Sequence, residues 1–334
     1  MKAVVFDRYG PPEVLQLRDI PKPCPKDDEV LIRIHRTTVP AEDPMIRGFT
    51  FSPLFWLPLR FAFGLLRPRK RILGSEFAGE IEAVGKSVTR FKVGDQVYGA
   101  DIKGLGACAE YKVIQENGMM LPKPANLTYD EVASACGSVA GWNVLRDQAN
   151  VQPGQKVLIN GASGNIGTHA VQIARHLGAE VTGVCSTRNL DLVRSIGAVH
   201  VLDYTQEDFT ENGQTYDVIF DAVSKRSFSQ CKQSLTHSGA YISAVPSITV
   251  LLQKFWTSKF GTKKVLFSAT GLRPIEERLA LFNEVDALVA QGIVKNVVDR
   301  HYSMEQLAEA HRYVATGRKR GSVVIDVIPA DQSI

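Results

Sequence analysis

A glycine-rich segment is the part of the sequence whose residue types and spacing point most directly to chemistry. Residues 156–167 read KVLINGASGNIG, in which an apolar run leads into Gly161, Gly164 and Gly167. Glycines placed this way permit a tight turn and a close approach of the backbone to a pyrophosphate. A helix that begins at Asn165 would direct its free amides and the positive end of its dipole to the same place. We expect five residues to bind a dinucleotide here: Ser163, Gly164, Asn165, Ile166 and Gly167.

The surrounding elements make this prediction more specific than the glycines alone. Ala162 stands where the usual fingerprint has its first glycine, but a second apolar run, Glu180–Ser186, follows at the spacing of a strand–helix–strand unit. The alternative is a glycine-rich turn without a ligand. Strand, loop, helix and strand in this order favour the nucleotide site.

The end of the second strand indicates which nicotinamide cofactor is bound. An NAD site usually has Asp or Glu there, whereas this chain has Ser186, Thr187 and Arg188. Two hydroxyls and a guanidinium can donate hydrogen bonds to the additional phosphate of NADP, which a carboxylate would repel. The residues therefore predict NADPH. Alternatively, the two hydroxyls cap a helix that begins near Asn189 and Arg188 is solvated, and this reading is compatible with phosphate binding.

Composition limits the class of protein. The 334 residues suffice for two domains, and the hydrophobic fraction of 44% and charged fraction of 22% are typical of a globular protein. A net charge of +4 is too small to indicate nucleic-acid binding, so we expect a small-molecule substrate. The strand-like run Ala3–Phe6 follows Met1 so closely that we expect no targeting segment and a cytoplasmic location. The five cysteines are scattered singly, which favours free thiols.

The chain divides into two regions with different periodicity. The first 120 residues contain short alternating runs at Glu29–Ile34, Phe77–Val84 and Gln96–Tyr98, which predict a β-rich, barrel-like domain. From about residue 129 helical and strand patterns alternate, which predicts a doubly wound α/β sheet. Its strand candidates are Val157–Asn160, Glu180–Ser186, His200–Asp203, Asp217–Ala222, Ala240–Ala244 and Val265–Ala269. The tail is predicted to form helices at Glu276–Ala290 and Met304–Ala315 and a strand at Val323–Val327 that returns to the first domain.

Over essentially its whole length the chain resembles the medium-chain dehydrogenase/reductase superfamily, and within it the zinc-free quinone oxidoreductase group that includes the zeta-crystallin-like proteins. The carriers are residues 2–15 (KAVVFDRYGPPEVL), 74–85 (GSEFAGEIEAVG), 91–99 (FKVGDQVYG), the glycine loop, 183–198 (GVCSTRNLDLVRSIGA) and 308–325.

The resemblance implies a fold, a cofactor and an assembly. It implies a Rossmann-type NADP-binding domain at 123–272, inserted between the halves of a split GroES-like catalytic domain at 1–122 and 273–334. NADPH would lie in the cleft, and the protein would be a homodimer or homotetramer. Tyr204 matches a tyrosine that often lies near the 2′-phosphate in these enzymes.

The zinc-dependent alcohol dehydrogenases of the same superfamily are one alternative. Where that branch has Gly-His-Glu, this chain has Gly74, Ser75 and Glu76, and the segment that should supply an early cysteine, Thr38–Asp43, contains none. Cys136 matches the remaining ligand, but a single thiolate cannot replace the set. We therefore expect no metal.

Without zinc, the implied reaction is hydride transfer from NADPH to a polarised acceptor such as a quinone or an α,β-unsaturated ketone. Reduction of an enone leaves charge on the carbonyl oxygen, which needs a donor. Three positions where the family often has asparagine, tyrosine and threonine are occupied in this chain by Pro40, Met45 and Ala140.

The loss of these three polar groups leaves Thr38, Asp43 and Arg47 as candidates for orienting the substrate. Asp43 could instead cap a short helix and pair with Arg47. A nucleotide-binding sensor or structural protein without turnover is a second alternative for the whole chain.

Residues 51–71 (FSPLFWLPLRFAFGLLRPRKR) are aromatic and leucine-rich and end in a basic cluster. The apolar run is too short and too interrupted to span a bilayer. We favour a hydrophobic lid over the substrate cleft, and an interfacial membrane anchor is the alternative. Ile248–Phe260 is expected to form a facing wall or an oligomer contact, with ordinary core burial as the alternative.

Overall fold

The structure is a computed structural model that describes residues 1–51, 53–245, 247–268 and 270–328. These residues form two compact units, each treated separately below. Unit 1 comprises Met1–Cys136 and the chain from Val298 on, and unit 2 comprises Gly137–Val297. The sequence-based boundaries, at 122/123 and 272/273, differ from this division.

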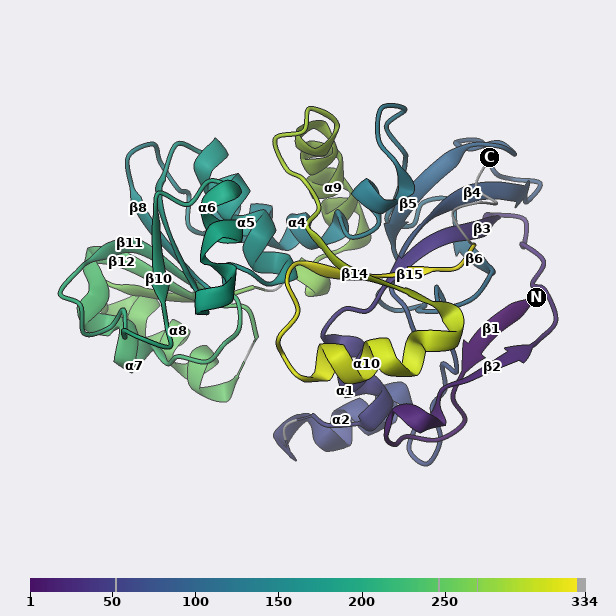
Figure 1. Cartoon of the computed structure of the whole chain (residues 1–334), viewed down its shortest axis with the longest axis horizontal. Helices are drawn as coiled ribbons and strands as arrows, with labels where there is room; N and C mark the ends of the chain where they lie inside the picture. The colour runs from purple at the N-terminus through teal and green to yellow at the C-terminus, as the bar shows by residue number, and fades with distance from the viewer. Residues whose placement is uncertain (52, 246, 269, 329–334) are drawn as a thin grey trace. The chain divides into compact units, whose positions relative to one another are not determined.

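A mixed sheet with seven strands among the described residues forms the frame of unit 1 (Figure 1). Its order is β14 (Val298–Ser303), β15 (Ser322–Asp326), β3 (Glu29–Thr38), β4 (Glu76–Val84), β5 (Gln96–Ala100) and β7 (Met120–Pro122), with β6 (Tyr111–Gln115) also paired to β3. β1 (Lys2–Val5) and β2 (Gln16–Asp19) pair separately. The alternating apolar residues of β3 and β4 are buried: Ile32, Ile34, Phe77 and Ile81. This packing explains why the β-rich prediction from the period-2 pattern is confirmed.

Short helices complete unit 1. α1 (Glu42–Gly48) follows β3, α3 (Tyr129–Val132) follows β7, and α10 (Leu307–Ala315) precedes β15. α2 (Pro53–Phe63) continues through Pro58, although the prolines made the sequence look interrupted there. β15 pairs antiparallel with β3, so the tail of the chain completes the sheet begun by the N-terminal segment.

Unit 2 is built on a parallel sheet, which confirms the predicted doubly wound fold (Figure 1). Six described strands have the order β10 (His200–Asp203), β9 (Glu180–Cys185), β8 (Lys156–Asn160), β11 (Tyr216–Asp221), β12 (Leu235–Ser243) and β13 (Lys264–Phe267). The order reverses between β8 and β11, which are hydrogen-bonded neighbours. Ligands of such sheets bind beyond the carboxyl ends of the strands at this switch point.

The helices that connect the strands of unit 2 lie on both faces of its sheet. α5 (Asn165–His176) and α6 (Leu190–Ser195) lie on one side, and α7 (Phe228–Cys231) and α8 (Ile248–Phe260) lie on the other (Figure 1). The predicted inner face of α5 is buried, and its residues are His169, Ala170, Ile173 and Ala174. Most predicted strand limits agree with the structure within one or two residues, but β12 begins five residues earlier and Ala269 lies outside the described residues.

α9 (Ile275–Ala290) and α4 (Cys136–Trp142) explain why unit 2 extends to Val297. The indole Nε1 of Trp142 donates a hydrogen bond of 2.7 Å to Glu284, and Arg146 forms an ion pair of 2.6 Å with the same carboxylate. An apolar residue pattern at the helical period shows that a helix packs against a core, but it does not show which of two cores it contacts.

In the described parts of the chain, no helix is long and apolar enough to cross a bilayer.

Candidate functional site

The glycine loop of unit 2 connects β8 to α5 at the switch point. Gly161 has φ of +81°, a left-handed conformation that side chains rarely adopt. A Cβ on Gly167 would lie 2.1 Å from the carbonyl oxygen of Gly161, so only glycine permits this turn. Ala162 is fully buried and lies against Gly183 of β9, which explains how the loop accommodates its departure from the glycine fingerprint.

The N-terminus of α5 presents polar groups that fit a pyrophosphate and a ribose. The N-cap residue is Gly164, and no side chain caps the first turn. The amides of Asn165 and Ile166 therefore lack a side-chain acceptor, as an anion-binding helix end requires. The buried Oδ1 of Asn165 makes no hydrogen bond with any residue that the structure describes. These groups fit a nicotinamide dinucleotide.

A buried pair of side chains joins the ends of the two strands at the switch point, next to this loop. Asn160, the last residue of β8, donates from Nδ2 to Oδ1 of Asp221, the last residue of β11, over 2.9 Å. The backbone amide of Arg226 donates to the other carboxylate oxygen over 2.8 Å. Burial raises the pKa of Asp221. This pair was not predicted from the sequence, although a polar residue near the end of each predicted strand was its signal.

Asn189 joins the glycine loop to the end of β9. Its buried Nδ2 donates to Ser163 Oγ over 2.9 Å and to Ser186 Oγ over 3.2 Å. Ser186 occupies the N-cap position of the short 3-10 helix Thr187–Asn189 but makes no side-chain cap hydrogen bond. The helix that begins near Asn189 is α6, whose N-cap residue is Asn189 itself, without a side-chain cap hydrogen bond, so the alternative in which Ser186 and Thr187 cap it is wrong.

Thr187 makes a contact that the sequence did not indicate. Its hydroxyl donates to Oδ2 of Asp203 over 2.5 Å, and Asp203 also accepts from the amide and hydroxyl of Thr205. The hydrogen bond from Thr187 is the main cause that lowers the pKa of Asp203. Tyr204, the next residue, is exposed, and its amide bonds to the carbonyl of Cys185. The structure thus brings Ser186, Thr187 and Tyr204 together at the carboxyl ends of β9 and β10.

Unit 1 contains the second set of candidates. The buried hydroxyl of Thr38 donates to the carboxylate of Glu76. Asp43, also buried, accepts from the amide of Gly74 over 3.1 Å. Burial holds the pKa of Asp43 well above its usual range, and the negative charges of Glu42 and Glu76 add to this effect. Asp43 therefore retains its proton at a higher pH than an ordinary aspartate.

Arg47 has a different environment from Asp43. Its Nε donates to the carbonyl of Gly10 over 3.1 Å, and burial lowers its pKa. No ion pair joins these two described side chains, so the expected alternative in which Asp43 pairs with Arg47 is wrong. Their spacing in the sequence suggested contact because residues four apart share a helix face, but Asp43 bonds to the chain before β4 instead.

Two of the residues compared with the zinc ligands, Glu76 and Cys136, interact electrostatically. Burial raises the pKa of the Cys136 thiol well above its usual range, and the negative charge of Glu76 adds to this effect. Among the described residues, three metal-ligating side chains come together at Asp130, His301 and Asp326. The guanidinium of Arg36 lies between those carboxylates, 2.7 Å from Asp130 and 3.1 Å from Asp326, and supplies their positive charge.

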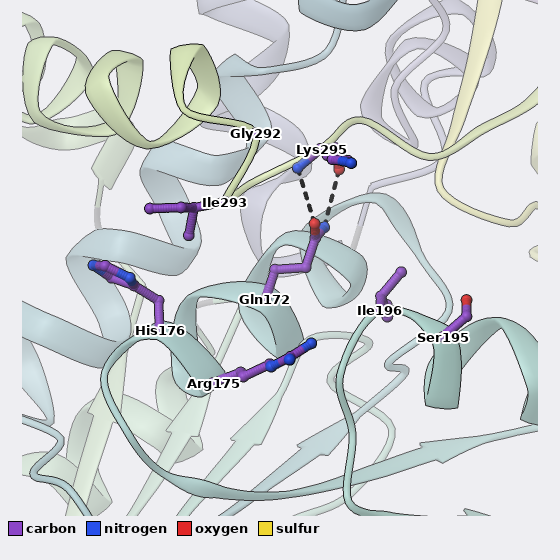
Figure 2. A pocket seen from close by; sticks show the side chains of 8 residues that line it. All are labelled: Gln172, Arg175, His176, Ser195, Ile196, Gly292, Ile293 and Lys295. Atoms are coloured by element: carbon purple, nitrogen blue, oxygen red, sulfur yellow. Dashed lines mark hydrogen bonds between the residues drawn. The ribbon is translucent and has the colours of Figure 1, made fainter.

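A cavity of about 460 Å³ in unit 2 lies at the other end of α5 (Figure 2). Gln172 crosses it and bonds to both backbone groups of Lys295, each over 2.9 Å. The other lining residues are Arg175, His176, Ser195, Ile196, Gly292 and Ile293. The last turn of α5 is about 16 Å from its first residue, so this cavity is separate from the glycine loop.

Comparison with known proteins agrees with both units. Residues 26–125 match the family described as "Alcohol dehydrogenase GroES-like domain", and residues 196–325 match the family described as "Zinc-binding dehydrogenase". Quinone-oxidoreductase QR1 of Triphysaria versicolor, described as chloroplastic, is 30% identical over 338 residues, which cover 98% of each chain. The human quinone oxidoreductase is 30% identical over 329 residues, covering 95% of this chain and 94% of the relative.

A solved structure shows the same fold. The Escherichia coli quinone oxidoreductase, crystallised in complex with NADPH, superposes with a TM-score of 0.82 and 24% sequence identity. The match covers 98% of this chain and all of that chain.

Proposed function

Since this chain belongs to the quinone oxidoreductase group of the medium-chain dehydrogenase/reductase superfamily, we propose a specific reaction for it. It is an oxidoreductase with a nicotinamide-binding fold. The proposed reaction is hydride transfer from NADPH to a quinone or a lipophilic α,β-unsaturated carbonyl compound, without zinc. NADPH would supply the hydride when bound. The protein's own residues would bind the cofactor, orient the acceptor and donate a hydrogen bond or proton to its oxygen.

The residue types at the end of β9 support NADPH. Ser186 stands where an NAD site has the Asp or Glu that binds the ribose hydroxyls. Asp203 ends the neighbouring strand β10, and its oxygens accept hydrogen bonds from Thr187 and Thr205. The neighbouring Ser186 and Arg188 supply a hydroxyl and a positive charge suited to a phosphate. This arrangement supports NADPH over NADH.

Asp43 is our candidate for orienting the acceptor and donating a hydrogen bond or proton to it. A protonated carboxyl can donate a hydrogen bond to an oxygen that gains charge as hydride is added. The pKa of Asp43, which burial raises, supports this role. Thr38 already donates its hydroxyl hydrogen to Glu76, so we assign it to positioning that carboxylate. The contact of Arg47 with Gly10 gives it less support as a substrate ligand.

Zinc-independent chemistry is supported by the ligand set. Ser75 replaces the histidine that the zinc branch uses, and the described residues place no third metal-ligating side chain with Glu76 and Cys136. Reduction of an acceptor already polarised by conjugation does not require a Lewis acid. Homodimer or homotetramer formation and a cytoplasmic location remain predictions from the sequence.

The test is NADPH oxidation by chelator-treated protein with a panel of quinones and enones. NADH and a saturated ketone serve as controls. We expect turnover that depends on the acceptor, prefers NADPH and is unaffected by chelation. Tight NADPH binding without turnover of any acceptor would instead favour a sensor or structural protein, with Pro40, Met45 and Ala140 as the explanation. Activity restored by added zinc would contradict the metal-free mechanism.

A further inference from the structure

α2 and the turn that follows it expose an unusual amount of apolar surface on unit 1. Leu57, Phe61 and Leu65 follow one another at four-residue spacing and are 55%, 59% and 52% exposed. Trp56 is also exposed, and Leu66 is 85% exposed. Large apolar side chains grouped in this way mark an interaction surface.

Arg60 and the turn after α2 hold this segment against the body of unit 1. The guanidinium of Arg60 stacks on Phe49 at 3.9 Å and on Tyr9 at 4.3 Å. The hydroxyl of Tyr9 donates to the carbonyl of Gly64 over 2.9 Å, and Arg60 donates to the carbonyl of Leu65 over 3.1 Å. These contacts anchor the segment to unit 1 while its large apolar side chains stay exposed.

Positive charge borders this apolar surface. No acidic residue occurs between Asp43 and Glu76. Arg67, Arg69 and Lys70 are exposed, and their charged groups make no hydrogen bond or ion pair with any described residue. Their charges are thus available to an external anionic surface.

A second apolar helix, α8 in unit 2, provides an informative contrast. It also exposes large side chains: Ile248, Leu251, Leu252, Phe255, Trp256 and Phe260. The lysines on and after this helix each make a local contact. Lys254 lies over the ring of Phe267, Lys259 lies over Phe255, and Lys264 of β13 donates to the backbone carbonyls of Thr257 and Gly261. A group of three cations without such contacts therefore distinguishes the α2 surface from α8.

We propose that residues 56–70 form a peripheral docking surface for an anionic lipid bilayer. Leu57, Phe61 and Leu66 enter the boundary between headgroups and acyl chains, and Arg67, Arg69 and Lys70 lie at the level of the anionic headgroups. The 11-residue helix is too short to span the bilayer, so the contact is interfacial and reversible. Each available cation strengthens binding by about fivefold at low salt, and added salt weakens this electrostatic contribution.

The test is co-sedimentation of the full chain with phosphatidylcholine vesicles that contain or lack phosphatidylserine. We expect binding that requires phosphatidylserine and weakens with salt. Leu57→Ser/Phe61→Ser/Leu66→Ser should abolish binding, and Arg67→Gln/Arg69→Gln/Lys70→Gln should weaken it by about a hundredfold. The matched control is Leu252→Ser/Trp256→Ser/Phe260→Ser in α8, which should bind normally. Loss of binding in the α8 variant but not in the α2 variants would overturn the proposal.

A fluorescence measurement locates the contact independently of these multiple variants. In a Trp256→Phe background the remaining tryptophans are Trp56 and the buried Trp142. Anionic vesicles should shift the emission of Trp56 to shorter wavelength, and brominated lipids should quench it. A Trp56→Phe/Trp256→Phe control should show neither effect.

Two further outcomes would overturn the proposal. One is the absence of vesicle binding together with impaired turnover of bulky acceptors in the α2 apolar variant, which would assign the segment to a lid. The other is an α2-dependent change in oligomeric state without lipid binding, which would assign it to a second copy. The binding assay uses no cofactor or acceptor, so its result does not depend on the proposed enzymatic function.

Discussion

Asn160 and Asp221 form a buried hydrogen bond of 2.9 Å between the carboxyl ends of two adjacent parallel strands, β8 and β11. The order of strands reverses at this point, and the glycine loop begins at the next residue after Asn160. The pair thus fixes the two strand ends from which the cofactor loop extends. A carboxylate in this buried place depends on its donors because burial disfavours its charged form.

Replacing Asn160 by Ala should destabilise the protein by about 1–3 kcal/mol, because Asp221 loses a donor without becoming solvated. The free energy of unfolding in urea measures this loss. Asn283→Ala, at an exposed position of α9, is the control and should change stability by less than about 0.5 kcal/mol. Equal stability of both variants would remove the structural role of the pair.

Two glycines of the cofactor loop should differ in what they support. Gly167→Ala should lower stability without any ligand by about 1–3 kcal/mol, since its Cβ would lie 2.1 Å from the Gly161 carbonyl oxygen. At Gly164 the nearest atom would be 3.5 Å away, so Gly164→Ala should leave stability nearly unchanged but weaken NADPH binding at the helix N-terminus. Thermal unfolding and NADPH titration measure the two effects. Unchanged NADPH affinity in Gly164→Ala would place the pyrophosphate elsewhere.

Arg188→Ala should raise the Kd for NADPH by about tenfold or more, because a charge-assisted hydrogen bond to the 2′-phosphate is lost. The Kd for NADH, which lacks this phosphate, should change by less than about twofold. Arg194→Ala is the matched control, since Arg194 is nearby in the sequence and pairs with Asp191. Similar losses for the two cofactors would exclude Arg188 as the phosphate ligand.

Asp43→Asn should make the stability of the folded protein less sensitive to rising pH. The pKa of Asp43 is raised in the folded state, so the native protein binds its proton more tightly than the unfolded chain does. This residue therefore contributes stability at low pH that is lost as pH rises above the ordinary aspartate pKa and through the folded value. The amide of the variant cannot ionise, so the variant does not lose stability in this way as pH rises. Urea unfolding of both proteins at acidic and neutral pH measures the difference, which should grow in favour of Asp43→Asn as pH rises.

The sequence alone determined the elements with a strong local signal. Residues 157–159 and 218–220 are the apolar centres of two buried strands, and α5 repeats its apolar residues at the helical period. The glycine loop was equally readable, because a positive φ at Gly161 and the lack of space at Gly167 require glycine whatever surrounds them. These features depend on neighbouring residues in the chain, so local physics specifies them.

Only the tertiary structure decided which distant residues became partners. Thr187 looked like a phosphate ligand or a helix cap, but the fold brings Asp203 within 2.5 Å of its hydroxyl. Asp43 and Arg47 are one helical turn apart, yet one bonds to Gly74 and the other to Gly10. A side chain's charge and hydrogen-bonding capacity are fixed by its type. Its partner is fixed by the packing of segments that the sequence separates, because burial makes an available donor or acceptor energetically necessary.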